Sequence, residues 1–153
     1  MNGPTFAAAD IGRLETLHGN LLDLCLRLEE VAGEPDVAVE LRALAEAMPP
    51  LLKAVHDLEE RLLFPDFDRH AGSAFATTAI AQWKAEHRCD RMAAEELAST
   101  LKAVAEDRCA LSSETVFRMI VGFQEALRRH VFSEKMMLEA LLSARAEDRN
   151  VFA

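Results

Sequence analysis

The helical pattern of this chain is clearest in residues 113–146, which read SETVFRMIVGFQEALRRHVFSEKMMLEALLSARA. The stretch contains no proline, and its apolar residues recur every three or four positions, as one face of an α-helix requires. That face consists of Phe117, Ile120, Phe123 with Gln124, Leu127, His130, Glu134, Leu138 and Leu141. A histidine and a glutamate therefore lie on a helical face that is predicted to point into a core.

The rest of the chain shows the same periodicity in three further segments, at about residues 10–31, 36–64 and 73–107. Asp10 is suited to cap the first segment, and Pro65 is expected to end the second. A proline inside a helix removes a backbone hydrogen bond, so the second segment should kink or split at Pro49-Pro50. Long helices joined by short loops pack as antiparallel neighbours. The sequence predicts an all-α, up-down-up-down four-helix bundle that forms one domain over residues 1–153.

The composition fits this fold and excludes several classes of partner. The chain has 153 residues, 50% of them hydrophobic, and only 6 glycines and 5 prolines, too few for a sheet rich in hairpins. It carries 26 acidic against 17 basic residues, a net charge of −9. Without a cluster of basic residues, we expect no binding to nucleic acid or to an anionic membrane surface. No apolar stretch approaches the roughly 20 residues that span a bilayer.

The cysteines and the first residues bear on location. The three cysteines are odd in number and widely spaced, which is typical of free thiols rather than of a disulfide framework. Residues 1–5 show no basic or apolar region of a secretory signal. We therefore expect a cytoplasmic protein.

Histidine and glutamate give the chain its candidate chemistry. Each predicted helix carries one histidine, and these are His18, His56, His87 and His130. His56 is followed four positions later by Glu60, and His130 by Glu134, so each pair lies on one face of its helix, about 6 Å apart. Measured along the bundle, the residues lie roughly 9–21 Å from the same end at about 1.5 Å per residue, close to a single layer.

Buried carboxylates and imidazoles need compensation, and a cation is the simplest source of it. Nitrogen and oxygen ligands without thiolate suit iron or manganese. The alternative for any one of the histidines is a hydrogen-bonded residue of the core. Cys25 is expected to pack in the core rather than to bind metal. Asp57 and Glu59 could also contribute carboxylates, but we expect them to be solvated.

These residues resemble the hemerythrin-like, or HHE cation-binding, family. The match consists of His18, the run from His56 to Pro65 with its Leu-Phe-Pro ending, Glu86-His87, and the run from His130 to Glu134. It covers nearly the whole chain. The resemblance implies an antiparallel four-helix bundle around two non-haem iron ions with a bridging oxo or hydroxo group. It also implies that Glu60 and Glu134 bridge the ions, that His18 and His56 bind one, and that His87 and His130 bind the other.

The chain departs from the oxygen carriers of that family in two ways. Trp83 occupies the position, one turn before His87, at which the carriers have a second histidine, and Glu134 replaces their aspartate. The set of four histidines and two glutamates is more similar to the iron–sulfur repair and iron-sensing branches. Trp83, Phe123 and either Met136 or Met137 are candidates for an apolar wall beside the metals.

Three functions are compatible with this pattern. The first is a di-iron binding protein whose site binds or senses O2, NO or iron. The second is a di-iron enzyme that removes peroxide or NO or repairs iron–sulfur clusters. The third is a metal-free helical interaction domain whose histidines are structural. The sequence leaves open whether the protein is an enzyme.

Overall fold

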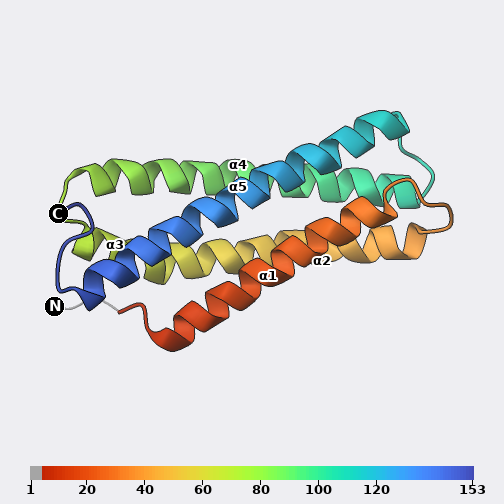
Figure 1. Ribbon diagram of the computed structural model, residues 1–153. Coiled ribbons are helices and arrows are strands. Elements are labelled where there is room, and N and C mark those ends of the chain that lie inside the picture. Colours follow the sequence, from red (N-terminus) through yellow and green to blue (C-terminus); the bar gives the residue numbers. More distant parts are fainter. Residues whose placement is uncertain (1–4) are drawn as a thin grey trace.

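The periodic segments form a helical bundle in the computed structural model, which describes residues 5–153 (Figure 1). Residues 1–4, part of the stretch judged to lack a secretory signal, lie outside the described residues. The helices are α1 (Ala8–Val31), α2 (Ala38–Leu58), the π-helix η1 (Glu59–Leu63), α3 (Phe64–Ala71), α4 (Phe75–Ala105) and α5 (Ser113–Ala146). Over residues 5–153 the structure contains no strand, and none of these helices is long and apolar enough to cross a membrane. The predicted helical fold is confirmed.

The four long helices surround one core. α1 packs against α2 and α5, and α4 packs against the same two helices, so the contacts close into a ring. Figure 1 shows the start of α1, the C-terminus and α3 at one end of the bundle, and the α1–α2 and α4–α5 connections at the other. The apolar face of each long helix is buried inside this ring, with Leu21, Leu52, Leu97 and Leu127 as fully buried or nearly fully buried examples. Any polar residue on these faces must also lie inside.

Side chains near the helix starts satisfy backbone groups that have no partner within the helix. Asp10 lies in the first turn of α1, and its carboxylate accepts a hydrogen bond from the Ala7 N–H at 3.0 Å. Ser112 precedes α5, and its hydroxyl accepts a hydrogen bond from the Thr115 N–H at 3.1 Å. Both contacts are typical of helix N-termini.

The second predicted segment differs from expectation at its prolines. α2 continues through Pro49-Pro50, so the predicted split is not seen; the kink stays a prediction. Pro50 cannot donate to the Glu46 carbonyl, and both residues are exposed, so water can donate to that carbonyl instead. Pro65 does not end the segment, because the backbone continues through η1 into α3 as far as Ala71. Pro65 lies in the first turn of α3, where a missing N–H costs little.

The break in this segment is the π-helix instead. The Phe64 N–H bonds to the Glu59 carbonyl, five residues earlier, rather than to the carbonyl four residues earlier. Such turns insert one extra residue into a helix and are frequent at functional sites. Here the π-helix begins directly after Leu58, three residues after His56, so it starts between the two members of the predicted His56–Glu60 pair. The π-helix therefore affects which carboxylate faces the core.

Candidate metal centre

Four helices of the bundle bring their histidines together. His18 lies on α1, His56 on α2, His87 on α4 and His130 on α5, and all four are buried. Glu134, one turn beyond His130 on α5, is buried as well. The structure thus places these five sequence-predicted residues in one interior cluster, at the level where the apolar faces meet.

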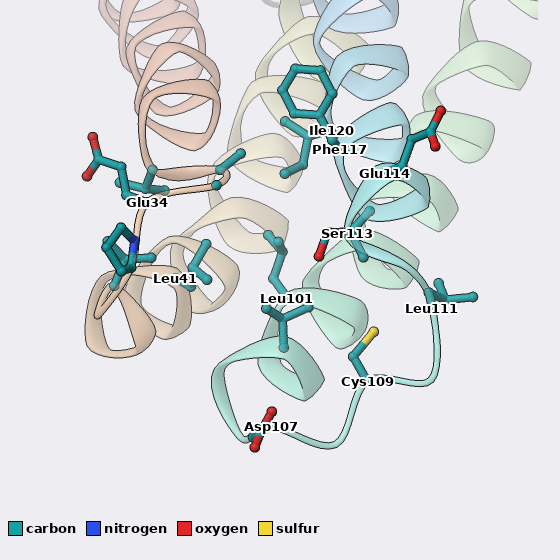
Figure 2. A pocket seen from close by; sticks show the side chains of 17 residues that line it. Glu34, Leu41, Leu101, Asp107, Cys109, Leu111, Ser113, Glu114, Phe117 and Ile120 are labelled. Atoms are coloured by element: carbon teal, nitrogen blue, oxygen red, sulfur yellow. The ribbon is translucent and has the colours of Figure 1, made fainter.

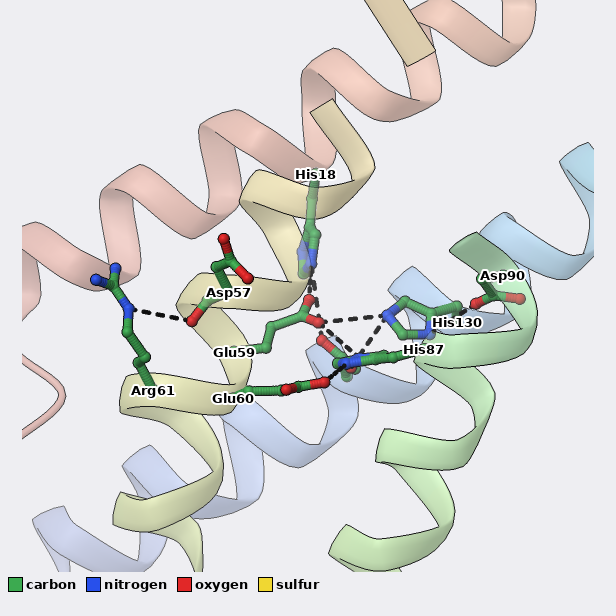
Figure 3. Close-up of polar contacts among 9 residues, drawn as sticks. His18, Asp57, Glu59, Glu60, Arg61, His87, Asp90 and His130 are labelled. Carbon is green, nitrogen blue, oxygen red and sulfur yellow. Dashed lines mark hydrogen bonds and ion pairs between the residues drawn. The ribbon is translucent and has the colours of Figure 1, made fainter. Parts of the chain in front are cut away.

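Glu59 lies at the centre of this cluster (Figure 3). Its side chain is 0% exposed. Its Oε1 atom lies 2.7 Å from the Nε2 atom of His18, and its Oε2 atom lies 3.0 Å from the Nε2 atom of His87. The same Oε2 atom lies 3.4 Å from the Nε2 atom of His130. The two oxygens of one carboxylate therefore face histidines from three different helices.

Glu134 faces the same histidines from the opposite helix. Its Oε1 atom lies 3.1 Å from the Nε2 atoms of both His87 and His130. Its Oε2 atom lies 3.9 Å from the Nε2 atom of His18. Each of the two buried carboxylates thus directs one oxygen toward His18 and the other toward the pair His87 and His130.

The donor atoms fall into two overlapping groups. One group consists of His56, Glu59, His87 and His130, and the other of His18, Glu59 and Glu134. Within each group the candidate ligand atoms all lie within 4.8 Å of one another, and every member is buried. Glu59 belongs to both groups. This is the arrangement in which one carboxylate can bridge two cations.

His56 tests whether the cluster suits a metal. Its ring stacks on that of His87, with centroids 3.8 Å apart and planes 7° from parallel. Within residues 5–153, neither ring nitrogen of this fully buried side chain has a hydrogen-bond partner, and the Oε2 atom of Glu134 has none either. A buried polar atom without a partner costs about 1–3 kcal/mol. A cation bound by these atoms would supply the missing partner, so the residues fit a metal centre.

The electrostatics of the cluster are those of strongly interacting charges. Burial, with the neighbouring His87, lowers the pKa of His56 to about 3. Burial also opposes charge on His87 and His130, but hydrogen bonds to Glu134 and Glu59 outweigh it and raise their pKa values to about 9 and about 11. Burial and the adjacent Glu59 raise the pKa of Glu134 to about 7. Hydrogen bonds from its neighbours outweigh burial at Glu59 and hold its pKa well below the usual range.

Glu60 occupies a different place from the one its spacing suggests. It is not a member of either group of donors, and its side chain is 32% exposed. Its Oε1 atom lies 2.7 Å from the Nδ1 atom of His87, the ring nitrogen that faces away from Glu59 and Glu134. The structure therefore brings Glu60 beside the cluster, and Glu59 into it.

The expectation that Glu59 is solvated is wrong. A residue three positions after His56 lies as near to it on a helix as one four positions after it, and either can share its face. The signal that could have identified Glu59 was this second spacing. Asp57 behaves as predicted: its side chain is 45% exposed and binds Lys53 at 2.5 Å.

Aromatic side chains line one side of the cluster. The Phe64 ring lies 5.4 Å from that of His87 and 5.6 Å from that of Trp83, so Phe64 contacts both the cluster and Trp83. Of the other predicted wall residues, Phe123 and Met137 are buried, whereas Met136 is 57% exposed.

Cys25 is buried in the core, as predicted. Burial raises the pKa of its thiol to about 11, so it stays protonated at neutral pH.

A separate cavity of about 720 Å³ lies at the end of the bundle where the α1–α2 and α4–α5 connections meet (Figure 2). Leu41, Leu101 and Ile120 form part of its apolar wall, and Cys109 lies at its edge. It shares no residue with the histidine cluster.

Comparison with known proteins agrees with this site. Residues 9–142 match the family model of the hemerythrin HHE cation-binding domain. Since the match spans α1 and nearly all of α5, the chain belongs to the hemerythrin HHE cation-binding family. Searches of curated proteins and of solved structures found no match. The family suggests cation binding, and the buried cluster is where the chain could hold the metal.

Proposed function

We propose that this protein is an antiparallel four-helix bundle that holds two non-haem iron ions and that its site binds or senses O2, NO or iron. His56, His87 and His130 would hold one ion, and His18 would hold the other, so His56 joins His87 and His130 rather than His18, with which the resemblance groups it. Glu59 and Glu134 would bridge them. The oxo or hydroxo bridge that the resemblance implies belongs to the proposal.

The observation that supports the proposal best is the position of Glu59. One of its oxygens faces His18 and the other faces His87 and His130. A carboxylate whose two oxygens serve two groups of buried donors is placed to bridge two cations. The proposal therefore assigns to Glu59 the bridging role that the His56–Glu60 spacing assigns to Glu60.

The proposal takes iron as the metal, which is compatible with the donors of the cluster and with the family resemblance. The donors are imidazoles and carboxylates without a thiolate, which suit iron or manganese. When bound, non-haem iron supplies reversible redox chemistry and open positions for small ligands. The protein residues bury the site and surround it with apolar groups such as Phe64.

All three cysteines are free, which supports a location in the reducing cytoplasm.

Metal analysis of the purified protein tests the proposal. Titration with Fe(II) under anaerobic conditions should end at two ions per chain, and exposure to air should produce near-ultraviolet absorption from an oxo-bridged ferric pair. In a separate sample kept in the ferrous form, O2 or NO should bind in a fixed ratio to the iron pair. If the protein is folded but takes up no iron, the metal-free interaction domain is the remaining function. Sustained turnover of peroxide or NO would identify the enzyme.

A further inference from the structure

His87 and His130 have a carboxylate on each side of the ring. Their Nε2 atoms face Glu59 and Glu134 in the interior, at 3.0–3.4 Å. On the far side of His87, the Nδ1 atom lies 2.7 Å from the Glu60 Oε1 atom.

His130 repeats the arrangement at a longer distance. Its Nδ1 atom lies 3.5 Å from the Asp90 Oδ2 atom, on α4 (Figure 3). The outer carboxylates are the more accessible ones: the side chains of Glu60 and Asp90 are 32% and 16% exposed, against 0% for Glu59.

The two nitrogens of an imidazole divide their roles when one binds a metal. The metal-bound nitrogen must lack a proton, and the other then carries N–H and donates it to a carboxylate, a carbonyl or water. A carboxylate accepts but cannot donate when ionised. Glu60 therefore favours the form of His87 in which Nδ1 carries the proton and Nε2 faces inward. Asp90 does the same for His130.

We propose that Glu60 and Asp90 are positioning residues that hold His87 and His130 with Nε2 toward the metals and make the two metal positions unequal. The inference rests on the proposed di-iron function. A carboxylate on the outer nitrogen makes the imidazole a stronger electron donor. The position bound by His87 and His130 is therefore the one that better stabilises ferric iron. His56, in the same group, has no hydrogen-bond partner within residues 5–153 and gains no such support.

Substitutions of Glu60 test this role, with Asp57 as the matched control. Asp57 lies on the preceding turn, and its carboxylate contacts Lys53 rather than a histidine of the cluster. Glu60→Ala should weaken Fe(II) binding about 10–100-fold, because the His87 ring loses its outer acceptor. Glu60→Gln should recover part of the affinity, since the amide oxygen still accepts the Nδ1 hydrogen but carries no charge. Asp57→Ala should bind iron like the unaltered protein.

The measurements are competition with a chromophoric Fe(II) chelator and the midpoint potential of the bound iron. The midpoint potential should rise in Glu60→Ala, because the His87 ring then donates less electron density to ferric iron, and it should stay unchanged in Asp57→Ala. A loss of packing alone would not raise the potential. Asp90→Ala should also lower the iron affinity and raise the midpoint potential, but by less than Glu60→Ala, because the Asp90–His130 contact is longer. Circular dichroism verifies that each variant is folded.

The other outcomes overturn the inference in distinguishable ways. If Glu60→Ala has the same iron affinity and midpoint potential as the unaltered protein, the inference is wrong. The proposed function still stands in that case, provided that the unaltered protein binds two irons. Loss of one iron in both Glu60→Ala and Glu60→Gln would make Glu60 a direct ligand, as the His56–Glu60 spacing predicts. An unaltered protein that binds no iron would overturn the proposed function and this inference with it.

Discussion

The adjacent residues Glu59 and Glu60 allow a matched test of which carboxylate serves the metals. Glu59→Gln and Glu60→Gln make the same chemical change at neighbouring positions and keep the side-chain volume. Glu59 is fully buried and contacts three histidines, whereas within residues 5–153 Glu60 contacts a single histidine nitrogen, the outer one of His87. Glu59→Gln should therefore abolish the bridge, and Glu60→Gln should leave both irons bound.

The size of the effect follows from linkage between binding and folding. Iron at 100 times its dissociation constant stabilises the folded state by about 2.7 kcal/mol for one site. A loss of affinity of about 100-fold in Glu59→Gln leaves roughly 0.4 kcal/mol, and a loss of about tenfold in Glu60→Gln leaves roughly 1.4 kcal/mol. For a chain of this size, about 1 kcal/mol corresponds to ~2–4 °C in Tm.

The assay is thermal unfolding with and without Fe(II) under anaerobic conditions. Iron should raise the Tm of the unaltered protein by roughly 5–11 °C, that of Glu60→Gln by roughly 3–6 °C and that of Glu59→Gln by only about 1–2 °C. The difference between each loaded and metal-free variant removes any effect of the substitution on the fold itself. The reverse order, with Glu60→Gln as the variant that no longer responds to iron, would refute the assignment of the bridge to Glu59.

Three further predictions concern the histidines of the cluster and the cap of α5. His56→Leu should weaken binding of the iron held by His56, His87 and His130, yet leave the metal-free protein as stable or more stable in urea, because it removes two buried nitrogens without partners; clear destabilisation would mean that His56 has a structural partner. The pKa values of His87 and His130 are raised to about 9 and about 11, so both are protonated at neutral pH without metal. Iron must displace these protons, so its affinity should rise with pH, and calorimetry in two buffers should detect proton release; affinity independent of pH would contradict this. Ser112→Ala should cost about 1 kcal/mol in urea unfolding through loss of the α5 cap and leave the iron content at two, and a change in iron content would show that the cap affects the site.

The long helices could be predicted because their apolar residues repeat at the helical period over many turns. Local departures from that period could not. The π-helix at Glu59–Leu63 and the continuation through Pro65 into α3 depend on packing between helices, which periodicity does not describe. Pro49-Pro50 lie inside an uninterrupted helix, because the surrounding bundle outweighs the lost hydrogen bonds.

The candidate site was predictable to the same extent. His18, His56, His87, His130 and Glu134 were identified from their helical faces, and the structure gathers them in the core. The carboxylate that joins His56 in the cluster, Glu59, was not identified. Positions three and four residues after His56 are nearly equivalent on a helix, and only the tertiary structure selects between them. The outer contacts of Glu60 and Asp90 join residues far apart in the sequence and have no local signal.

The proposed bridge between two iron ions at Glu59 can be observed by anomalous diffraction at the iron edge, from crystals of the iron-loaded protein. Two iron peaks are expected, one beside His87 and His130 and one beside His18, with the Glu59 carboxylate between them. A single peak, or two peaks joined by the Glu60 carboxylate with Glu59 turned away, would contradict it.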